Sequence, residues 1–127
     1  MKNDEVNDLF RNRTMTFALK VIEFLETVPF NSVTKTLSSQ LCASASSTAA
    51  NWRAFCRARS KNERFAKVCI VVEEADESQF WIEMFLRLEY GKKELLPALL
   101  DESTQILKVM TAIKDNQYKM KRENVRG

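Results

Sequence analysis

The chain has 127 residues, of which 45% are hydrophobic and 29% charged, and it contains only two glycines and two prolines. This composition excludes a disordered chain and predicts one packed, helical domain over residues 1–127. The longest strictly apolar run, residues 68–72, is too short to cross a bilayer, and the polar N-terminus lacks a signal-peptide core, so we expect a cytoplasmic protein with no membrane partner.

The first predicted helix runs from about residue 4 to residue 27. Its apolar side chains recur with the spacing of an α-helix, at Phe10, Phe17 and Val21 among others. Pro29 ends this helix, because the residue before a proline avoids helical backbone angles.

The second helix is expected from residue 33 to residue 57, with Asn31 or Ser32 as its N-cap. The residues of its predicted apolar face are Val33, Leu37, Leu41, Ala45, Thr48, Trp52 and Phe55.

The run of small residues from 43 to 50 is open to two interpretations, a flexible Ser/Ala linker or a continuation of this helix. We favour the helix, because the run has no glycine or proline and the apolar face stays in phase across it. Ala45 and Ala49 would then let a neighbouring helix approach closely.

The third helix is expected from residue 60 to residue 90. Ser60 and Glu63 have the spacing of a capping box at the start of the helix. Gly91 can adopt the left-handed backbone conformation that commonly ends a helix. The stretch 65–72 is apolar on more than one face, so a single bundle would leave part of it uncovered. This excess of apolar surface predicts a partner subunit, that is, a homo-oligomer.

The fourth helix is expected from about residue 94 to residue 118, with Pro97 tolerated near its start or marking a short break. The basic tail, residues 119–127, has no cap and is expected to fray. Four long helices joined by short connections predict an all-α, antiparallel up-down-up-down four-helix bundle.

The chain has no histidine, and its three cysteines, Cys42, Cys56 and Cys69, form no CxxC pair. A zinc site is therefore not expected, and the thiols are expected to be reduced and mostly buried as small hydrophobes. We predict no metal and no cofactor.

Four of the five residues from 73 to 77 are acidic. Without histidine, a di-iron or acid–base site built on Glu73, Asp76 and Glu77 is disfavoured, so we predict no catalytic residue. In an antiparallel pair of helices two and three these acids would face the serine-rich run, or an arginine of a neighbouring subunit. Trp81 would pack at this level and donate its indole N–H to an acceptor.

Residues 31–61 contain five basic residues and no acidic one. The basic residues around the predicted corner between helices two and three are Arg53, Arg57, Arg59, Lys61, Arg64 and Lys67. One interpretation is a nucleic-acid-binding patch whose cations contact phosphates. The other is a solvated helix end, or salt bridges to the acidic part of helix three in another subunit. The aromatic residues near this corner, Trp52, Phe55 and Phe65, are expected in the core rather than in contact with bases.

Segments 51–61 and 73–83, with Lys67 between them, resemble the family called four-helix bundle protein or 23S rRNA intervening-sequence protein, some members of which are called ribosomal proteins. The ARSK and EADES–FW signals carry this resemblance, which covers nearly the whole chain. It implies a bacterial protein that assembles as a ring, typically a homopentamer. Some members are encoded within intervening sequences of large ribosomal RNA genes. Relatives serve diversity-generating retroelements, where a basic ring engages RNA and a reverse transcriptase, and no enzymatic activity is established for the family.

Two functions therefore stay open. The first is a non-enzymatic ring associated with RNA or DNA. The second is a protein-interaction scaffold, such as a reverse-transcriptase accessory ring, whose charges serve assembly. Salt-dependent retention on RNA separates the two. Whether the acids of segment 73–77 lie within one bundle or between subunits also stays open.

Overall fold

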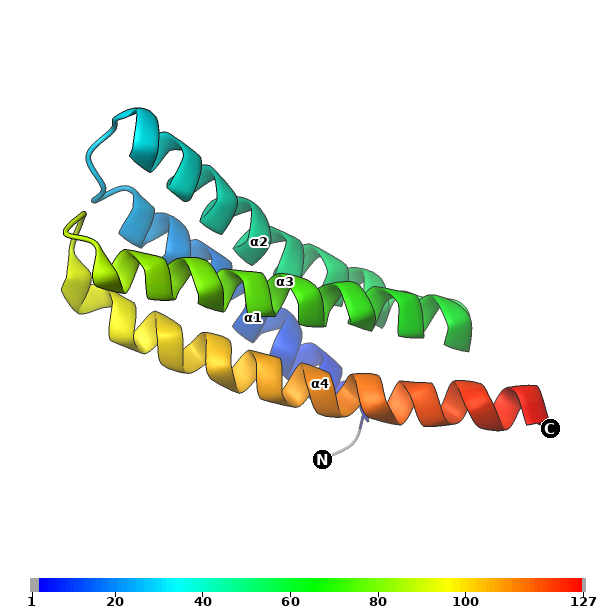
Figure 1. Ribbon diagram of the computed structural model, residues 1–127. Coiled ribbons are helices and arrows are strands. Elements are labelled where there is room, and N and C mark those ends of the chain that lie inside the picture. Colours follow the sequence, from blue (N-terminus) through cyan, green and yellow to red (C-terminus); the bar gives the residue numbers. More distant parts are fainter. Residues whose placement is uncertain (1–2, 127) are drawn as a thin grey trace.

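Four long helices make up most of the chain in the computed structural model, which describes residues 3–126 (Figure 1). They are α1 (Asn3–Leu25), α2 (Ser32–Cys56), α3 (Lys61–Arg87) and α4 (Leu96–Arg126), with a 3₁₀ turn, η1 (Lys93–Leu95), before α4. No strand occurs within this described range. The predicted all-α fold of four helices is therefore confirmed.

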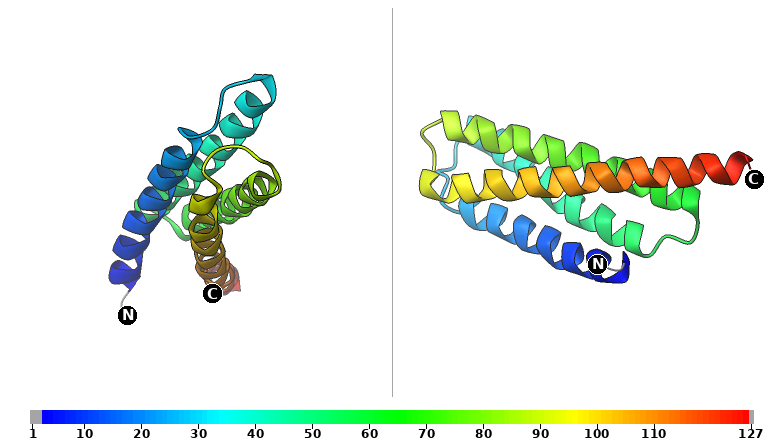
Figure 2. Two further views of the ribbon diagram at one scale, coloured as in Figure 1. Left: turned by 90° about the vertical axis from the view of Figure 1, so that its left-hand side faces the viewer. Right: turned by 90° about the horizontal axis from the view of Figure 1, so that it is seen from below.

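The helices lie side by side, and the chain reverses direction at each connection (Figures 1 and 2). α2 packs extensively against α3, and α3 against α4, whereas α1 packs against α2 and less extensively against α4. α1 and α3 therefore occupy opposite corners of the bundle (Figure 2, left). As a result, the outward faces of α1 and α3 point to different sides of the molecule.

The core is filled by large side chains from all four helices. Phe24 of α1 meets Phe85 of α3 edge to face, with the ring centroids 5.3 Å apart. Trp52 of α2 is fully enclosed and stacks on Phe55, and its indole nitrogen donates to the carbonyl oxygen of Asn7 in α1 at 3.2 Å. The expectation that Trp52 and Phe55 belong to the core is confirmed.

A complete capping box begins α2. Asn31 Oδ1 accepts hydrogen bonds from the backbone nitrogens of Val33 and Thr34, both at 2.9 Å, and Thr34 Oγ1 accepts from the Asn31 nitrogen. Asn31 is therefore the N-cap. Because the reciprocal bond turns Thr34 inward, Val33 is left 57% exposed, and its predicted place on the apolar face is wrong.

The run of small residues from 43 to 50 is helical throughout, so the linker interpretation is wrong. Its inward positions, Ser44, Ala45 and Thr48, are almost completely buried. Ser78 Oγ of α3 donates to Ser44 Oγ at 3.1 Å. Small side chains thus let α2 and α3 approach closely along this seam. Ala49, by contrast, is half-buried on the side of α2 that faces α1.

The apolar first half of α3 is only partly enclosed. Val68 and Val71 are fully buried, whereas Cys69, Ile70 and Val72 are half-buried. The most exposed large apolar side chains lie elsewhere: Leu9, Met15 and Leu19 on α1, Phe30 and Val33 at the α1–α2 connection, Phe80 on α3 and Tyr118 on α4. The uncovered apolar surface is therefore not where the sequence analysis expects it.

α3 ends at Arg87, earlier than expected, and Gly91 is not its stop. Gly91 instead lies within the connection to α4 with a φ of 73°, a left-handed conformation that glycine adopts without strain. A Cβ at this position would lie 2.8 Å from Thr27 Oγ1, the oxygen that accepts a hydrogen bond from the Lys92 nitrogen at 2.9 Å. This close approach holds the connection against the end of α1.

α4 begins at Leu96 with Pro97 in its first turn and continues to Arg126. The basic tail predicted to lie beyond the fourth helix is thus part of α4 as far as residue 126, while residue 127 lies outside the described residues. The helix continues because Gln117 is buried against the bundle and Lys121 lies over the ring of Phe65 in α3. This end of α4 projects past the α2–α3 connection (Figures 1 and 2).

The seam between α2 and α3 generates a stability prediction. Ala45 is 1% exposed, so Ala45→Leu forces extra volume into a closed contact and should lower the free energy of unfolding by about 1–3 kcal/mol. Urea or thermal unfolding measures this decrease. Ala43→Leu, at an exposed position of the same helix, is the matched control. Equal stability of the two variants would contradict the close packing of the seam.

Candidate nucleic-acid interface

The basic residues that the sequence analysis groups at one corner occupy two separate places. Arg53, near the end of α2, and Arg57, its C-cap, line a hollow shared with α1. Arg59 is exposed in the connection to α3. The other three, Lys61, Arg64 and Lys67, are half-buried on the first turns of α3. The chain reversal thus divides the predicted patch between the end of α2, beside α1, and the first turns of α3.

Two hydrogen bonds hold the start of α3. Ser60 Oγ accepts from the Glu63 nitrogen at 3.1 Å, as the predicted capping box requires. The Glu63 carboxylate, however, accepts from the backbone nitrogen of Arg59 at 3.0 Å rather than from that of Ser60. The second half of the capping box is therefore displaced by one residue. Together the two bonds fix the direction of the first turn of α3 and hence the position of Lys61.

An aromatic pair lies beside this helix start. The ring centroids of Phe65 in α3 and Tyr118 in α4 are 5.8 Å apart, and Tyr118 is 49% exposed. Lys121 Nζ lies 5.1 Å from the Phe65 ring centroid, and Arg122 Cζ lies 5.8 Å from that of Tyr118. Phe65 is half-buried and belongs to this surface, so its predicted place in the core is wrong.

We call this surface the α3–α4 corner. Its two rings are Phe65 and Tyr118, and Lys121 and Arg122 lie over them. Lys61 precedes Phe65 by one turn on the same face of α3 and is a third cation of the corner. Such a combination suits a single strand of nucleic acid, because exposed aromatic faces stack with bases while the neighbouring cations contact phosphates.

Three members of the corner were missed from the sequence, namely Tyr118, Lys121 and Arg122. The charged tail predicts that the fourth helix ends at residue 118, so these residues are not expected to lie on a helix beside α3. Lys114, Tyr118 and Arg122 follow the buried Met110 at four-residue intervals, which is helical spacing, and Gln117 next to Tyr118 is also buried. Extending that spacing is the signal that could have kept the tail on a helix beside α3.

The acidic run of α3 points away from the serine-rich part of α2. Glu73, Asp76 and Glu77 are exposed, whereas Ala75 and Ser78 are buried. The expectation that the acids face the serines is therefore wrong, because the small residues of α3 occupy that contact instead.

Glu74 is the half-buried member of the run. Burial raises the pKa of its carboxyl group, and the nearby carboxylates of Glu77 and Glu73 raise it further. The folded chain therefore binds a proton at Glu74 more tightly than the unfolded chain does.

Trp81 does not make the predicted hydrogen bond. Its indole nitrogen is buried and has no hydrogen-bond partner among the residues that the structure describes. The indole packs edge to face with Phe80 instead, with the ring centroids 4.9 Å apart. Trp81 therefore packs against the exposed ring of Phe80 and does not donate a hydrogen bond to α2.

The remaining candidates for site chemistry are few. Between residues 3 and 126 there is no group of three side chains suited to hold a metal ion. Cys42, Cys56 and Cys69 are half-buried free thiols, and burial raises the pKa of Cys56. None of the described helices combines the length and hydropathy needed to cross a membrane.

The chain is similar to known proteins over most of its length. The family model described as 23S rRNA-intervening sequence protein matches residues 9–112. A crystal structure of a protein of unknown function from the S23 ribosomal protein family of Bacteroides thetaiotaomicron is 26% identical, with a TM-score of 0.72, over 82% of this chain and 96% of that chain. No curated protein matches significantly. The α4 side of the corner lies outside the matched range, whereas its α3 side lies within it.

The raised pKa of Glu74 generates a prediction about pH. The folded chain binds this proton more tightly than the unfolded chain, so stability is lost as pH rises through the ordinary glutamate range to the raised pKa. Glu74→Gln removes this loss and should raise Tm modestly at pH 7. The gain should vanish below about pH 4, where the unfolded chain is also protonated.

Thermal unfolding across this pH range checks the prediction. Glu83→Gln, at an exposed position of the same helix, is the control and should raise Tm less. A gain from Glu74→Gln that grows as pH falls would contradict the assignment.

Proposed function

The chain belongs to the 23S rRNA-intervening sequence protein family, and from this premise we propose that it is a non-enzymatic, homo-oligomeric bundle that associates with RNA. The observation that carries the proposal is the α3–α4 corner, where cations surround a partly exposed aromatic pair. The free thiols suit a reducing compartment, which supports a place in the cytoplasm.

The corner favours single-stranded RNA over a duplex. Tyr118 offers a ring face to an unstacked base, and a base-paired strand would not expose such a base. The net charge of +3 is modest for one copy. An oligomer that repeats the corner on every subunit would raise the overall affinity through several simultaneous contacts with one strand.

Uncovered apolar side chains support the homo-oligomer. Met15 and Leu19 on α1 are 50% and 58% exposed, and Phe80 on α3, at the opposite corner, is 51% exposed. Large exposed apolar side chains on two sides of the molecule suit a protein that contacts neighbouring subunits on both sides. We propose that the antiparallel up-down-up-down bundles assemble into a ring. The resemblance noted above implies five subunits.

The placement of the carboxylates supports a binding role over catalysis. Glu73, Asp76 and Glu77 are exposed on the outer face of α3. None of them lines the hollow between α1 and α2 or the second hollow beside the α1–α2 connection. Carboxylates placed in this way lack the enclosed setting in which acid–base chemistry is usually found.

A second candidate function is a protein-interaction scaffold, for example an accessory ring for a reverse transcriptase. The hollow between α1 and α2 favours it, because this hollow combines an apolar lining with arginines. Retention on RNA separates the two functions, since the scaffold alone predicts no affinity for RNA.

Binding of a labelled single-stranded RNA of mixed sequence tests the proposal. Tyr118→Ala should weaken binding by about 1–3 kcal/mol, because it removes a ring on which a base stacks. The double variant Lys121→Ala and Arg122→Ala should lower the slope of log affinity against log salt by about 0.7 for each phosphate that the protein no longer neutralises. Fluorescence anisotropy over a series of salt concentrations measures both effects.

Lys108→Ala provides the matched control, because Lys108 is an exposed cation of α4 outside the corner. Its salt slope should match that of the wild type. If wild-type protein is not retained on RNA at low salt, the RNA association is wrong and the scaffold remains. If Lys108→Ala weakens binding as much as the corner variants do, the corner is not the interface.

A further inference from the structure

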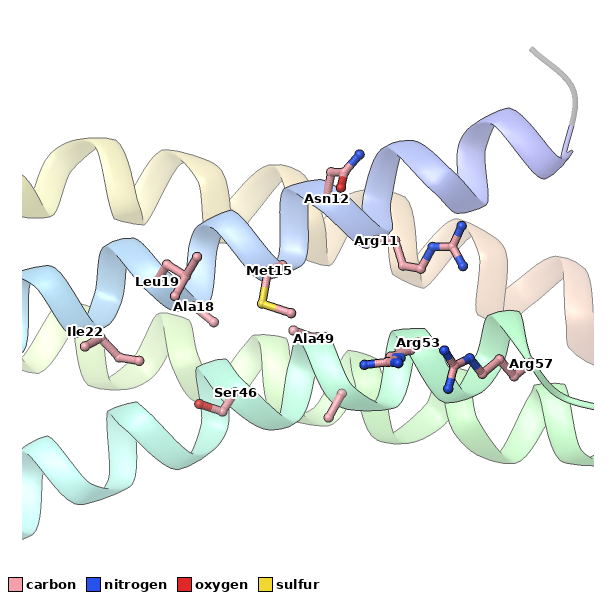
Figure 3. A pocket seen from close by; sticks show the side chains of 11 residues that line it. Arg11, Asn12, Met15, Ala18, Leu19, Ile22, Ser46, Ala49, Arg53 and Arg57 are labelled. Atoms are coloured by element: carbon pink, nitrogen blue, oxygen red, sulfur yellow. The ribbon is translucent and has the colours of Figure 1, made fainter.

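A groove of about 590 Å³ runs between α1 and α2 (Figure 3). Part of its lining is apolar, with Met15 and Leu19 on α1 opposite Ala49 on α2. At one end, Arg53 and Arg57 of α2 lie across from Arg11 of α1. The groove therefore offers an apolar surface that passes into a strongly basic one.

The two arginines of α2 are available for an outside partner. Arg11 forms an ion pair with Asp8 of its own helix. Among residues 3–126, neither Arg53 nor Arg57 is paired with a carboxylate, and both are exposed. Their pairing with an acidic surface would therefore disrupt no existing ion pair.

An acidic stripe with one exposed aromatic ring lies on the outer face of α3. Its residues, all exposed, are Glu73, Asp76, Glu77, Phe80 and Glu83. Phe80 is 51% exposed, and Trp81 supports its ring from one side. An aromatic side chain surrounded by acids is chemically complementary to an apolar groove that ends in arginines.

We infer that the α1–α2 groove of one copy receives the acidic stripe of α3 from a second copy, with Phe80 in the apolar part and the acids facing Arg53 and Arg57. This inference rests on the proposed homo-oligomer and names the surfaces that form it. It also assigns the acids of segment 73–77 to the space between subunits rather than to the interior of one bundle.

The spacing of the residues along the groove matches the spacing of the residues along the acidic stripe. Along α2, Arg53 follows Ala49 by about one helical turn, and Arg57 follows by about two, or ~11 Å. Along α3, Glu77 precedes Phe80 by about one turn, and Glu73 precedes it by about two. With Phe80 beside Ala49, Glu77 therefore lies beside Arg53 and Glu73 beside Arg57.

Charge also selects the direction in which the stripe lies. In the arrangement just given, the incoming α3 runs antiparallel to α2. In the opposite direction, Glu83 would lie beside Arg53, and Arg87 would meet Arg57 with like charge. The antiparallel direction avoids this repulsion.

The direction in turn restricts the symmetry of the assembly. Within one copy, α3 already runs antiparallel to α2 (Figure 1). The α3 helices of two bound copies therefore run parallel, which relates the copies by rotation about an axis along the bundle. The groove lies on the α1–α2 side and the stripe on the helix opposite α1, so each copy binds one neighbour through each surface. Such a head-to-tail contact closes into a ring when the rotation permits.

A complementation experiment with two variants of the full chain tests the inference. Arg53→Glu combined with Arg57→Glu disables the groove, and Phe80→Asp disables the stripe. Each variant alone should have the monomer mass of 14.7 kDa by light scattering, whereas the wild type should be larger. Mixed in equal amounts, they should form a dimer of twice that mass, because one intact groove meets one intact stripe and nothing further can add.

Circular dichroism verifies that each variant is folded, and Glu77→Lys serves as a second stripe variant if Phe80→Asp is not. Tyr118→Asp is the matched control, because its ring is exposed to the same extent as that of Phe80 but lies at the α3–α4 corner. It should assemble like the wild type.

The failures of the two proposals are distinguishable. If the wild type assembles and the folded variants assemble equally well, the pairing of groove and stripe is overturned while the homo-oligomer stands. If the variants are monomers and remain so when mixed, the two surfaces are not partners, and the pairing is again overturned. A monomeric wild type overturns both the homo-oligomer and the pairing, whereas its retention on RNA is judged separately.

Discussion

The close contact between small residues of α2 and α3 determines which faces both helices present to the outside. Ser44 of α2 accepts a hydrogen bond from Ser78 of α3, and the small neighbours Ala45 and Ala75 are likewise buried. Because an α-helix turns by about 100° per residue, fixing two positions of α3 inward directs the intervening positions outward. The acidic stripe, the exposed ring of Phe80 and the arginines beside α1 are therefore consequences of how this seam packs.

The helices themselves were predictable from the sequence, since apolar periodicity, Pro29 and the absence of other breakers determine them locally. The rotation of α3 about its own axis was not predictable from the sequence. It depends on which residue of α3 meets Ser44, and this is set by the length and shape of the turn around Ser60. A displacement of two residues rotates a helix face by about 200°. That rotation is enough to move acids such as Asp76 from an expected inward position to the exposed one that they occupy.

The candidate site was predictable only in part, for a related reason. Lys61 was identified from charge alone, but Tyr118 and Lys121 join it through the tertiary contact of α4 with Phe65. Charge patterning also placed Arg57 and Arg59 in one patch, although of these two exposed arginines Arg57 lines the groove and Arg59 lies in the connection. Single-sequence patterns describe each helix well, whereas the grouping of side chains from different helices requires their packing.

The projecting end of α4 has a consequence for how the protein fluctuates. Near the α2–α3 connection α4 contacts the first turns of α3, as Lys121 does with Phe65, and its last turns project beyond the start of α3. Helical segments with few tertiary contacts open at a lower free energy than the core, and they do so without unfolding the rest of the domain. Amide hydrogens near Tyr118 should therefore exchange with solvent independently of those around Trp52 and Val71. A molecule that settles on this end would slow their exchange and leave the exchange of the core amides unchanged.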